Sequence, residues 1–231
     1  MIGFFSRFLD TLAPRACCVC HGRLTMTEEI VCANCLLHLP RTRFWLDPYE
    51  NEMARLFWIQ VPVERAAAWF YYSPRAKTAN IIYDLKYHNH PEIGGFAGSQ
   101  LAMECKQCGF FDGIDVIVPV PIAKKRRRHR GYNQSELIAE GISEVSGLPT
   151  AFDVVSRKEF VESQTHKNRQ GRLENVETAF HLDKPDAVSG KHVLVVDDII
   201  TTGATLVSLA KEIAKAGDVK FSFLSLGYTK G

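Results

Sequence analysis

The strongest constraint on the fold of this chain is the segment of residues 193–205, VLVVDDIITTGAT. Its first four residues are apolar and mostly β-branched, which predicts a buried central strand. Two aspartates, Asp197 and Asp198, follow directly, and the chain then turns through threonines and a glycine into a helical pattern. Adjacent carboxylates at a strand end are costly unless they meet cations or hydroxyl groups.

The turn after the two aspartates has the chemistry of a phosphate cradle. It offers free backbone N–H groups, threonine hydroxyls and, at Gly203, a residue that lets a ligand approach the backbone closely. It also precedes a helix, whose N-terminus favours anions. Carboxylates beside such a turn suit a ligand with ribose hydroxyls and a phosphate. The alternative is an ordinary strand and helix cap with both carboxylates in solvent.

From Arg65 onward the chain alternates between strand-like and helix-like segments. The predicted strands cover residues 66–72, 114–119, 152–155, 192–196 and 219–226. The predicted helices cover residues 77–85, 95–105, 135–145 and 204–216. This order predicts an α/β fold with a mostly parallel sheet flanked by helices, whose ligands bind beyond the carboxyl ends of the strands.

Two C-x-x-C pairs near the start of the chain predict a structural zinc site with the ligands Cys17, Cys20, Cys32 and Cys35. A segment this short rarely folds without a staple, and structural zinc supplies on the order of 10 kcal/mol. We therefore expect a small zinc-ribbon-like module with a connector over residues 1–60, and the main domain over residues 61–231.

Alternatives to this ligand set remain open from the sequence alone. Cys18 could replace Cys17 with a tighter spacing, His21 or His38 could replace a thiolate, and all four cysteines could be free thiols. Cys105 and Cys108 are expected to be core or free thiols. C-x-x-C pairs of this kind are typical of a reducing compartment, so a cytoplasmic protein is expected.

The overall composition excludes a membrane-spanning segment and a generally basic protein. No run of about 18 apolar residues occurs, so no membrane span is expected. The net charge is only +2, so attraction to nucleic acid would require local clustering. Residues 124–130 provide such a cluster, with six cations in seven residues. We expect an extended, solvated loop there, which binds a diphosphate, binds a nucleic acid backbone or simply forms surface.

Two further segments carry expectations of their own. Residues 1–12 have apolar side chains at helical spacing and predict a short docking helix. Residues 161–175 are polar and aperiodic, which is typical of a lid over an active site or of an unstructured insertion.

The segment of residues 193–205 resembles the phosphoribosyl pyrophosphate (PRPP) signature of type I phosphoribosyltransferases. The resemblance implies that fold, with Asp197 and Asp198 facing the ribose hydroxyls directly or through Mg²⁺. It also implies that the turn after them holds the 5-phosphate. The residues that the turn would contribute are Thr201, Thr202, Gly203, Ala204 and Thr205.

Residues 83–87, YDLKY, resemble the pyrophosphate loop of the same fold. The likeness implies that Leu85, Lys86 and Tyr87 contact PRPP, that Lys86 faces the diphosphate, and that the Leu85–Lys86 peptide is a candidate for the cis form. The alternative is that Lys86 ends an amphipathic helix.

Other motifs resemble the ComF family of competence-associated proteins, which also has a four-cysteine zinc module at the N-terminus. They are Pro119-Val120-Pro121, Arg126, residues 130–135, and the later set Gln164, Arg169, Asn175 and Phe180. This likeness implies that Arg126 and Arg130 bind the diphosphate end of PRPP.

Two functions follow from the resemblance. In the first, Asp197, Asp198, Lys86 and Arg126 catalyse phosphoribosyl transfer from PRPP to a nitrogen nucleophile, with Mg²⁺ and release of diphosphate. In the second, the chain is a DNA-uptake accessory that senses a nucleotide-like ligand and contacts single-stranded DNA or competence and DNA-processing proteins. Oligomers are possible, and the sequence does not indicate the acceptor base.

Overall fold

The structure, a computed structural model, describes residues 15–158 and 179–230. The helix expected over residues 1–12 and the lid expected over residues 161–175 lie outside the described residues, as do Gln164, Arg169 and Asn175. In the described part of the chain, no helix is both long enough and apolar enough to cross a membrane.

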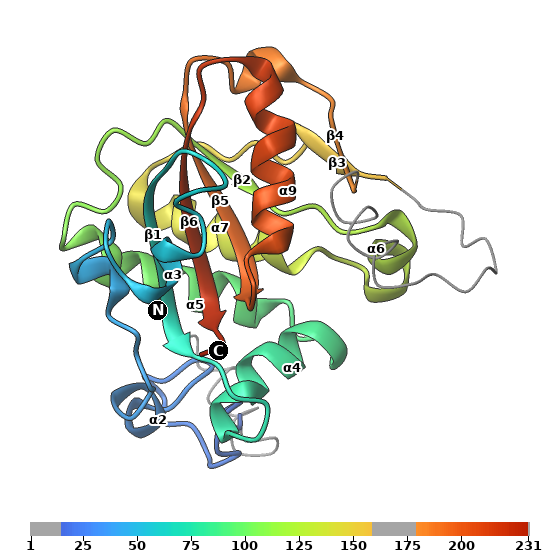
Figure 1. The fold of residues 1–231 in the computed structure, drawn as a ribbon. Helices are drawn as coiled ribbons and strands as arrows, with labels where there is room; N and C mark the ends of the chain where they lie inside the picture. The colour runs from blue at the N-terminus through green and yellow to red at the C-terminus, as the bar shows by residue number, and fades with distance from the viewer. Residues whose placement is uncertain (1–14, 159–178, 231) are drawn as a thin grey trace.

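A four-stranded parallel sheet forms the centre of the molecule, in the order β1-β6-β5-β2 (Figure 1). Its strands are β1 (Val63–Tyr71), β2 (Val116–Pro119), β5 (His192–Ile200) and β6 (Lys220–Tyr228). In β5, Val196 pairs with Pro119 on one side and with Leu224 on the other. Residues 193–196 of β5 are fully buried, as expected for an interior strand of a parallel sheet.

Helices cover both faces of this sheet. Figure 1 shows α9 (Ala204–Ile213) on one face, and α5 (Glu92–Lys106) and α7 (Gln134–Ser146) on the other. Helices α5 and α7 pack so closely that a Cβ atom at Gly98 would lie 2.2 Å from the carbonyl oxygen of Ile138. Glycine is therefore required at that crossing. The predicted α/β fold with a parallel sheet flanked by helices is confirmed.

The observed helices follow the predicted ones with small differences at their ends. The helix predicted over residues 77–85 is a 3₁₀ turn, η2 (Lys77–Ala79), that continues into α4 (Asn80–Tyr87). The helix predicted over residues 204–216 ends with a second 3₁₀ turn, η4 (Ala214–Ala216). Strand β5 continues through both aspartates to Ile200, beyond the end predicted at residue 196.

Two predictions about local structure are wrong. The strand expected over residues 152–155 is shifted to β3 (Val155–Arg157), which pairs antiparallel with β4 (Phe180–Leu182) outside the main sheet. The run of residues 124–130 is a helix, α6 (Lys124–Arg130), rather than an extended loop. The ion pair of Arg127 with Glu136 (2.6 Å) reduces the repulsion between the cations of α6. Gly131 ends the helix, with a φ of +88°.

The residues before β1 form short elements that pack against the main domain. They are α2 (Ala33–Leu37), η1 (Phe44–Leu46) and α3 (Glu52–Arg55). A further 3₁₀ turn, η3 (Pro185–Ala187), precedes β5. Arg41 Nε donates to Glu104 Oε1 (2.8 Å), which also accepts from Trp69 Nε1 (3.0 Å). One hydrophobic core runs from Cys17 to Tyr228. The division of the chain at residue 60 stays a prediction.

Candidate functional site

A cavity of about 700 Å³ opens beside the carboxyl ends of β2 and β5. Adjacent parallel strands place their carboxyl ends at one edge of the sheet, so residues distant in the sequence meet there. The lining residues come from α4, α6, α7, β3, β5, the start of α9 and the loops between them. They are Lys86, Tyr87, Asn89, Val120, Ile122, Arg126, His129, Arg130, Gln134, Ser135, Arg157, Asp197, Asp198, Ile199 and Thr205.

The two aspartates at the end of β5 line this cavity and have polar partners. Ser135 Oγ donates to Asp197 Oδ1 (3.2 Å), and the backbone N–H of Asp198 donates to the same oxygen (2.9 Å). Lys86 Nζ lies 2.8 Å from Asp198 Oδ1. A cation and a hydroxyl group therefore stabilise the adjacent carboxylates, as the cost of burying them requires.

The protonation of Asp197 is balanced near neutrality. Burial, followed by the negative charge of Asp198, raises the pKa of Asp197 to about 7 from its ordinary value of 3.8. The hydrogen bond from the Asp198 N–H, the Lys86 ammonium and the Ser135 hydroxyl act in the opposite direction. A divalent cation or a hydroxyl-bearing ligand in the cavity would favour the ionised form.

Lys86 reaches the aspartates from a helix and not from a loop. Lys86 lies in the last turn of α4, so the alternative that it ends a helix is right for its backbone. Its side chain nevertheless reaches the cavity, where the ammonium group pairs with Asp198. The expected cis peptide before Lys86 is wrong, since the described residues contain no cis peptide bond. Helical geometry at both residues requires the trans form.

The neighbours of Lys86 differ in their access to the cavity. Leu85 is fully buried, and its carbonyl oxygen accepts from the Tyr132 hydroxyl (2.8 Å). The structure therefore does not bring Leu85 to the cavity. Tyr87 lines it with an exposed ring, and the Arg130 guanidinium lies 5.5 Å from the centre of that ring.

The turn that resembles a phosphate cradle contributes Thr205 to the lining. Thr201, Thr202, Gly203 and Ala204 precede it at the N-terminus of α9 and are not among the lining residues. Gly203 has a φ of +76°, and a Cβ atom there would lie 2.6 Å from Phe57 Cε1. Both the left-handed backbone and the close ring require glycine at this position.

Arg157 is a cavity residue that the sequence analysis missed. It comes from β3, and its guanidinium lies 5.3 Å from the ring centre of Phe180. Burial, and then the charge of Arg126, lowers the pKa of Arg157, while Asp197 acts in the opposite direction. No local spacing signals this residue, because only the fold brings β3 to the cavity. Gln134 and Ser135, also missed as site residues, lie within the motif of residues 130–135.

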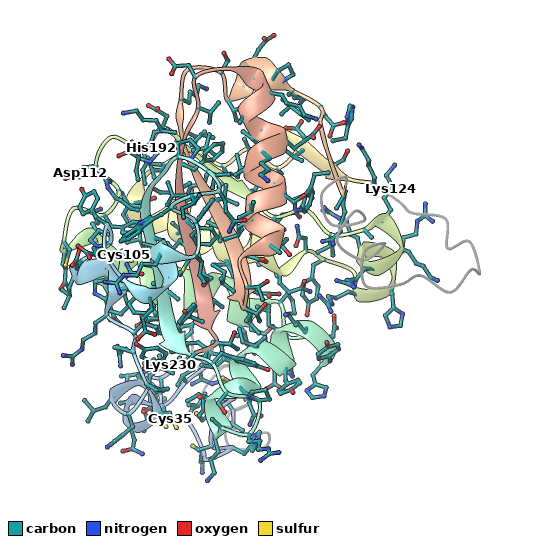
Figure 2. All side chains as sticks on the ribbon, in the orientation of Figure 1. Cys35, Cys105, Asp112, Lys124, His192 and Lys230 are labelled. Carbon is teal, nitrogen blue, oxygen red and sulfur yellow. The ribbon has the colours of Figure 1, made fainter. Side chains whose placement is uncertain are left out.

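The four predicted cysteines form a separate cluster, with all four sulfur atoms within 4.8 Å of one another. Figure 2 shows Cys35 at the same end of the molecule as Lys230, which follows the carboxyl end of β6. Backbone N–H groups donate to three of the sulfurs: Cys32 to Cys17 (3.3 Å), Gly22 to Cys20 (3.4 Å) and Cys35 to Cys32 (3.4 Å).

The pKa shifts within the cluster differ in direction: the pKa of Cys17 is lowered, whereas burial and hydrogen bonds with Cys32 and Cys20 raise the pKa of Cys35. Burial raises the pKa of Cys17, but hydrogen bonds from backbone N–H groups outweigh it and lower the pKa to about 7. Burial raises the pKa of Cys18 to about 12, and Cys18 is outside the cluster. His21 and His38 are exposed and also lie outside it, so neither replaces a cysteine among the described residues.

The cluster also has the dimensions of a tetrahedral zinc site. A tetrahedron with Zn–S bonds of about 2.3 Å separates its sulfurs by about 3.8 Å. The sulfurs of Cys20 and Cys32 are 3.8 Å apart. Four sulfur ligands complete the shell, so the residues fit a structural ion and not a catalytic one.

Comparisons with known proteins agree with this arrangement. The family model described as phosphoribosyl transferase domain matches residues 132–221. The DNA utilization protein YhgH of Escherichia coli (strain K12) is 29% identical over 209 residues, which are 87% of this chain and 85% of that protein. Competence protein F of Haemophilus influenzae is 33% identical over 104 residues, which are 45% of each chain.

Solved structures show a weaker likeness. The glutamine PRPP amidotransferase from Bacillus subtilis, complexed with ADP and GMP, is 20% identical with a TM-score of 0.42, over 61% of this chain and 30% of that one. The described residues therefore combine a four-cysteine cluster with an α/β domain that matches the phosphoribosyl transferase family model, and over most of its length the chain is similar to proteins of the ComF/YhgH family.

Proposed function

We propose that this protein binds PRPP with Mg²⁺ and transfers the phosphoribosyl group to a nitrogen nucleophile. The observation that carries the proposal is the meeting of the Asp197–Asp198 pair with Lys86 in one cavity beside the turn that begins α9. Carboxylates suit ribose hydroxyls, an ammonium group suits a diphosphate, and a helix N-terminus suits a phosphate.

In this proposal, different residues of the cavity bind different parts of PRPP. Asp197 and Asp198 accept hydrogen bonds from the ribose hydroxyls, and residues 201–205 hold the 5-phosphate with backbone N–H groups and hydroxyls. Lys86, Arg126 and Arg130 face the diphosphate, and Tyr87 lies beside it. These two carboxylates also fit Mg²⁺, which prefers oxygen ligands and keeps several waters. When bound, Mg²⁺ would neutralise part of the diphosphate charge.

The reaction exchanges one bond at C1 of the ribose for another. The lone pair of the acceptor nitrogen forms the new C1–N bond as the C1–O bond breaks, and the electron pair of that bond leaves with the diphosphate. Positive charge develops on the ribose in the transition state, beside the carboxylates of Asp197 and Asp198. Lys86 and Arg126 stabilise the negative charge on the leaving group, so positioning and electrostatics supply most of the acceleration.

Two measurements test this function. Calorimetry with PRPP and Mg²⁺ is expected to show one binding site per chain, and a nucleobase panel is expected to release diphosphate with at least one base. Absence of PRPP binding would contradict the proposed function.

A second candidate function is a DNA-uptake accessory, and the proteins to which the chain is similar motivate it. Helix α6 presents exposed cations, among them Lys124, Lys125 and Arg128, which contact no carboxylate in the described part of the chain. Such cations suit a nucleic acid backbone. PRPP binding without diphosphate release on any base would favour this function. Binding of single-stranded DNA would then weaken with salt by about 0.7 log units per phosphate contact.

We further propose that the four-cysteine cluster holds one structural zinc ion per chain. Elemental analysis of the purified protein is expected to give one zinc, and Cys32→Ser is expected to lose the metal and lower the melting temperature. Cys108→Ser is the matched control, because Cys108 is exposed and lies outside the cluster. A zinc content of zero in the unmodified protein would contradict the assignment.

A further inference from the structure

Two polar residues that line the cavity, Gln134 and Arg157, take no part in the proposed PRPP contacts. Gln134, the first residue of α7, is 1% exposed, and its side-chain nitrogen Nε2 is buried without a hydrogen-bond partner in the described residues. A buried amide group left without a partner costs about 1–3 kcal/mol, so it marks a place where something else completes the structure.

Arg157, in β3, also lines the cavity, and its guanidinium contacts the Phe180 ring but no carboxylate in the described residues. No ion pair joins its guanidinium to a carboxylate in residues 15–158 and 179–230, whereas Lys86 is paired with Asp198 and Arg127 with Glu136. The charges that act on it are Arg126, which repels it, and Asp197, which attracts it. A partly buried guanidinium next to a second one gains strongly from an oxygen ligand.

Both residues line the cavity between the groups proposed for the ribose and those proposed for the diphosphate. Gln134 precedes Ser135, whose hydroxyl donates to Asp197 (3.2 Å). Arg157 interacts electrostatically with Arg126, proposed for the diphosphate, and with the Asp197 carboxylate, proposed for the ribose. Asp197 holds the ribose in the proposed function. Gln134 and Arg157 therefore flank the ribose, where an acceptor that attacks C1 has to lie.

We propose that Gln134 and Arg157 form the acceptor subsite and select a nitrogen heterocycle that carries oxo or carboxylate oxygens. The inference rests on the proposed transfer of a phosphoribosyl group. The Gln134 amide N–H₂ has no hydrogen-bond partner in the described residues, the Arg157 guanidinium has no carboxylate partner there, and both groups donate hydrogen bonds. An oxygen on the heterocycle accepts hydrogen bonds from these two groups. An amino substituent at the same position is itself a donor, so it cannot accept from them. A site built from buried hydrogen-bonding groups rejects an unmatched analogue strongly.

The test uses pairs of bases that differ in one substituent. Nicotinate and nicotinamide, uracil and cytosine, and hypoxanthine and adenine are each added to the full-length protein with PRPP and Mg²⁺, and diphosphate release is measured. PRPP affinity is measured separately by calorimetry. The oxygen-bearing member of at least one pair is expected to react about tenfold faster or more than its partner.

Variants of the subsite decide which residues carry the preference. Arg157→Gln and Gln134→Ala are expected to abolish the preference within the reactive pair while PRPP affinity stays at the wild-type level. Arg128→Gln is the matched control, because this arginine is exposed on α6 and does not line the cavity. It is expected to leave the preference intact.

The outcomes separate this inference from the function on which it rests. Absence of PRPP binding overturns both. Normal PRPP binding with faster reaction of the amino- or amide-bearing bases overturns the subsite alone. Normal PRPP binding with no base reacting overturns both the transfer and the subsite. Loss of PRPP affinity in Arg157→Gln also overturns it, since Arg157 would then bind the diphosphate.

Discussion

The two ends of strand β5 hold polar groups in opposite ways. At its start, His192 is buried, its ring nitrogen Nε2 lies 2.8 Å from Ser222 Oγ, and its backbone N–H donates to Asp115 Oδ2 (2.8 Å). At its far end, Asp197 and Asp198 line an open cavity. Figure 2 shows His192 at the opposite end of the sheet from Lys230, which follows the carboxyl end of β6.

Burial is the main cause of the pKa shifts at both ends of β5, but the resulting charge states differ. Burial lowers the pKa of His192, so the ring stays neutral with its partner in place. Burial and the charge of Asp198 raise the pKa of Asp197. The start of the strand is complete without a ligand, whereas the far end concentrates charge that a ligand or cation would balance. Unbalanced charge, more than buried polarity as such, therefore supports the proposal that the far end of β5 binds a ligand.

The largest expected effect comes from removing both charges at the far end. Asp197→Asn with Asp198→Asn is expected to weaken PRPP binding by about 100-fold or more, because two charge-assisted hydrogen bonds to the ribose are lost. Calorimetry measures the affinity, and circular dichroism checks that the fold is retained. Asp186→Asn, at an exposed position, is the matched control. Unchanged affinity in the double variant would remove the ribose role.

A smaller loss is expected when the cation at the same end is removed. Lys86→Ala is expected to weaken PRPP binding about tenfold, since a charge-assisted hydrogen bond contributes about 1.5–3 kcal/mol and Asp198 loses its partner. The control is Lys77→Ala, an exposed lysine just before α4. Equal affinities of the two variants for PRPP would show that Lys86 only stabilises Asp198 in the absence of ligand.

A substitution at the start of β5 is expected to change the stability of the protein but not its affinity for PRPP. Ser222→Ala removes the hydroxyl partner of His192 and is expected to lower the free energy of unfolding by about 1 kcal/mol. PRPP affinity is expected to stay unchanged. Chemical denaturation and calorimetry on the same preparation measure both. A loss of PRPP affinity without a loss of stability would contradict the distinction between the two ends.

The smallest and most specific effect is an opposite pH dependence at the two ends. The pKa of Asp197 is raised in the folded protein, so its contribution to stability is complete below 3.8 and is lost as the pH rises through about 7. The pKa of His192 is lowered from 6.5, so its contribution is present above that value and is lost as the pH falls. Each effect is at most about 1.4 kcal/mol per pH unit.

Variants at each end separate these two contributions. Without added Mg²⁺, Asp197→Asn is expected to gain stability relative to wild type as the pH rises from 4 to about 7. His192→Gln is expected to lose less stability than wild type on acidification below 6.5. Melting temperatures across the pH range measure both, and the same sign at both ends would show that burial does not control these groups.

Local patterns were enough to predict most of the helices and strands and the four-cysteine cluster. The apolar run of residues 193–196 predicted β5, and the spacing of the four cysteines predicted the cluster that the structure shows. Local reasoning failed for α6, because the ion pair of Arg127 with Glu136 reaches into another helix. It also failed for β3, whose partner β4 lies beyond residue 158 and outside the main sheet.

The sequence by itself determined which chemistry this protein carries: two adjacent carboxylates before a glycine turn, and thiols spaced to meet around one point. These groups are close in the chain, so backbone geometry alone brings them together. Only the tertiary structure decided that Lys86, Ser135 and Arg157 join Asp197 and Asp198, because parallel strands bring the ends of distant segments to one edge of a sheet. No spacing in the sequence encodes that meeting; the hydrophobic packing of the strands and helices produces it.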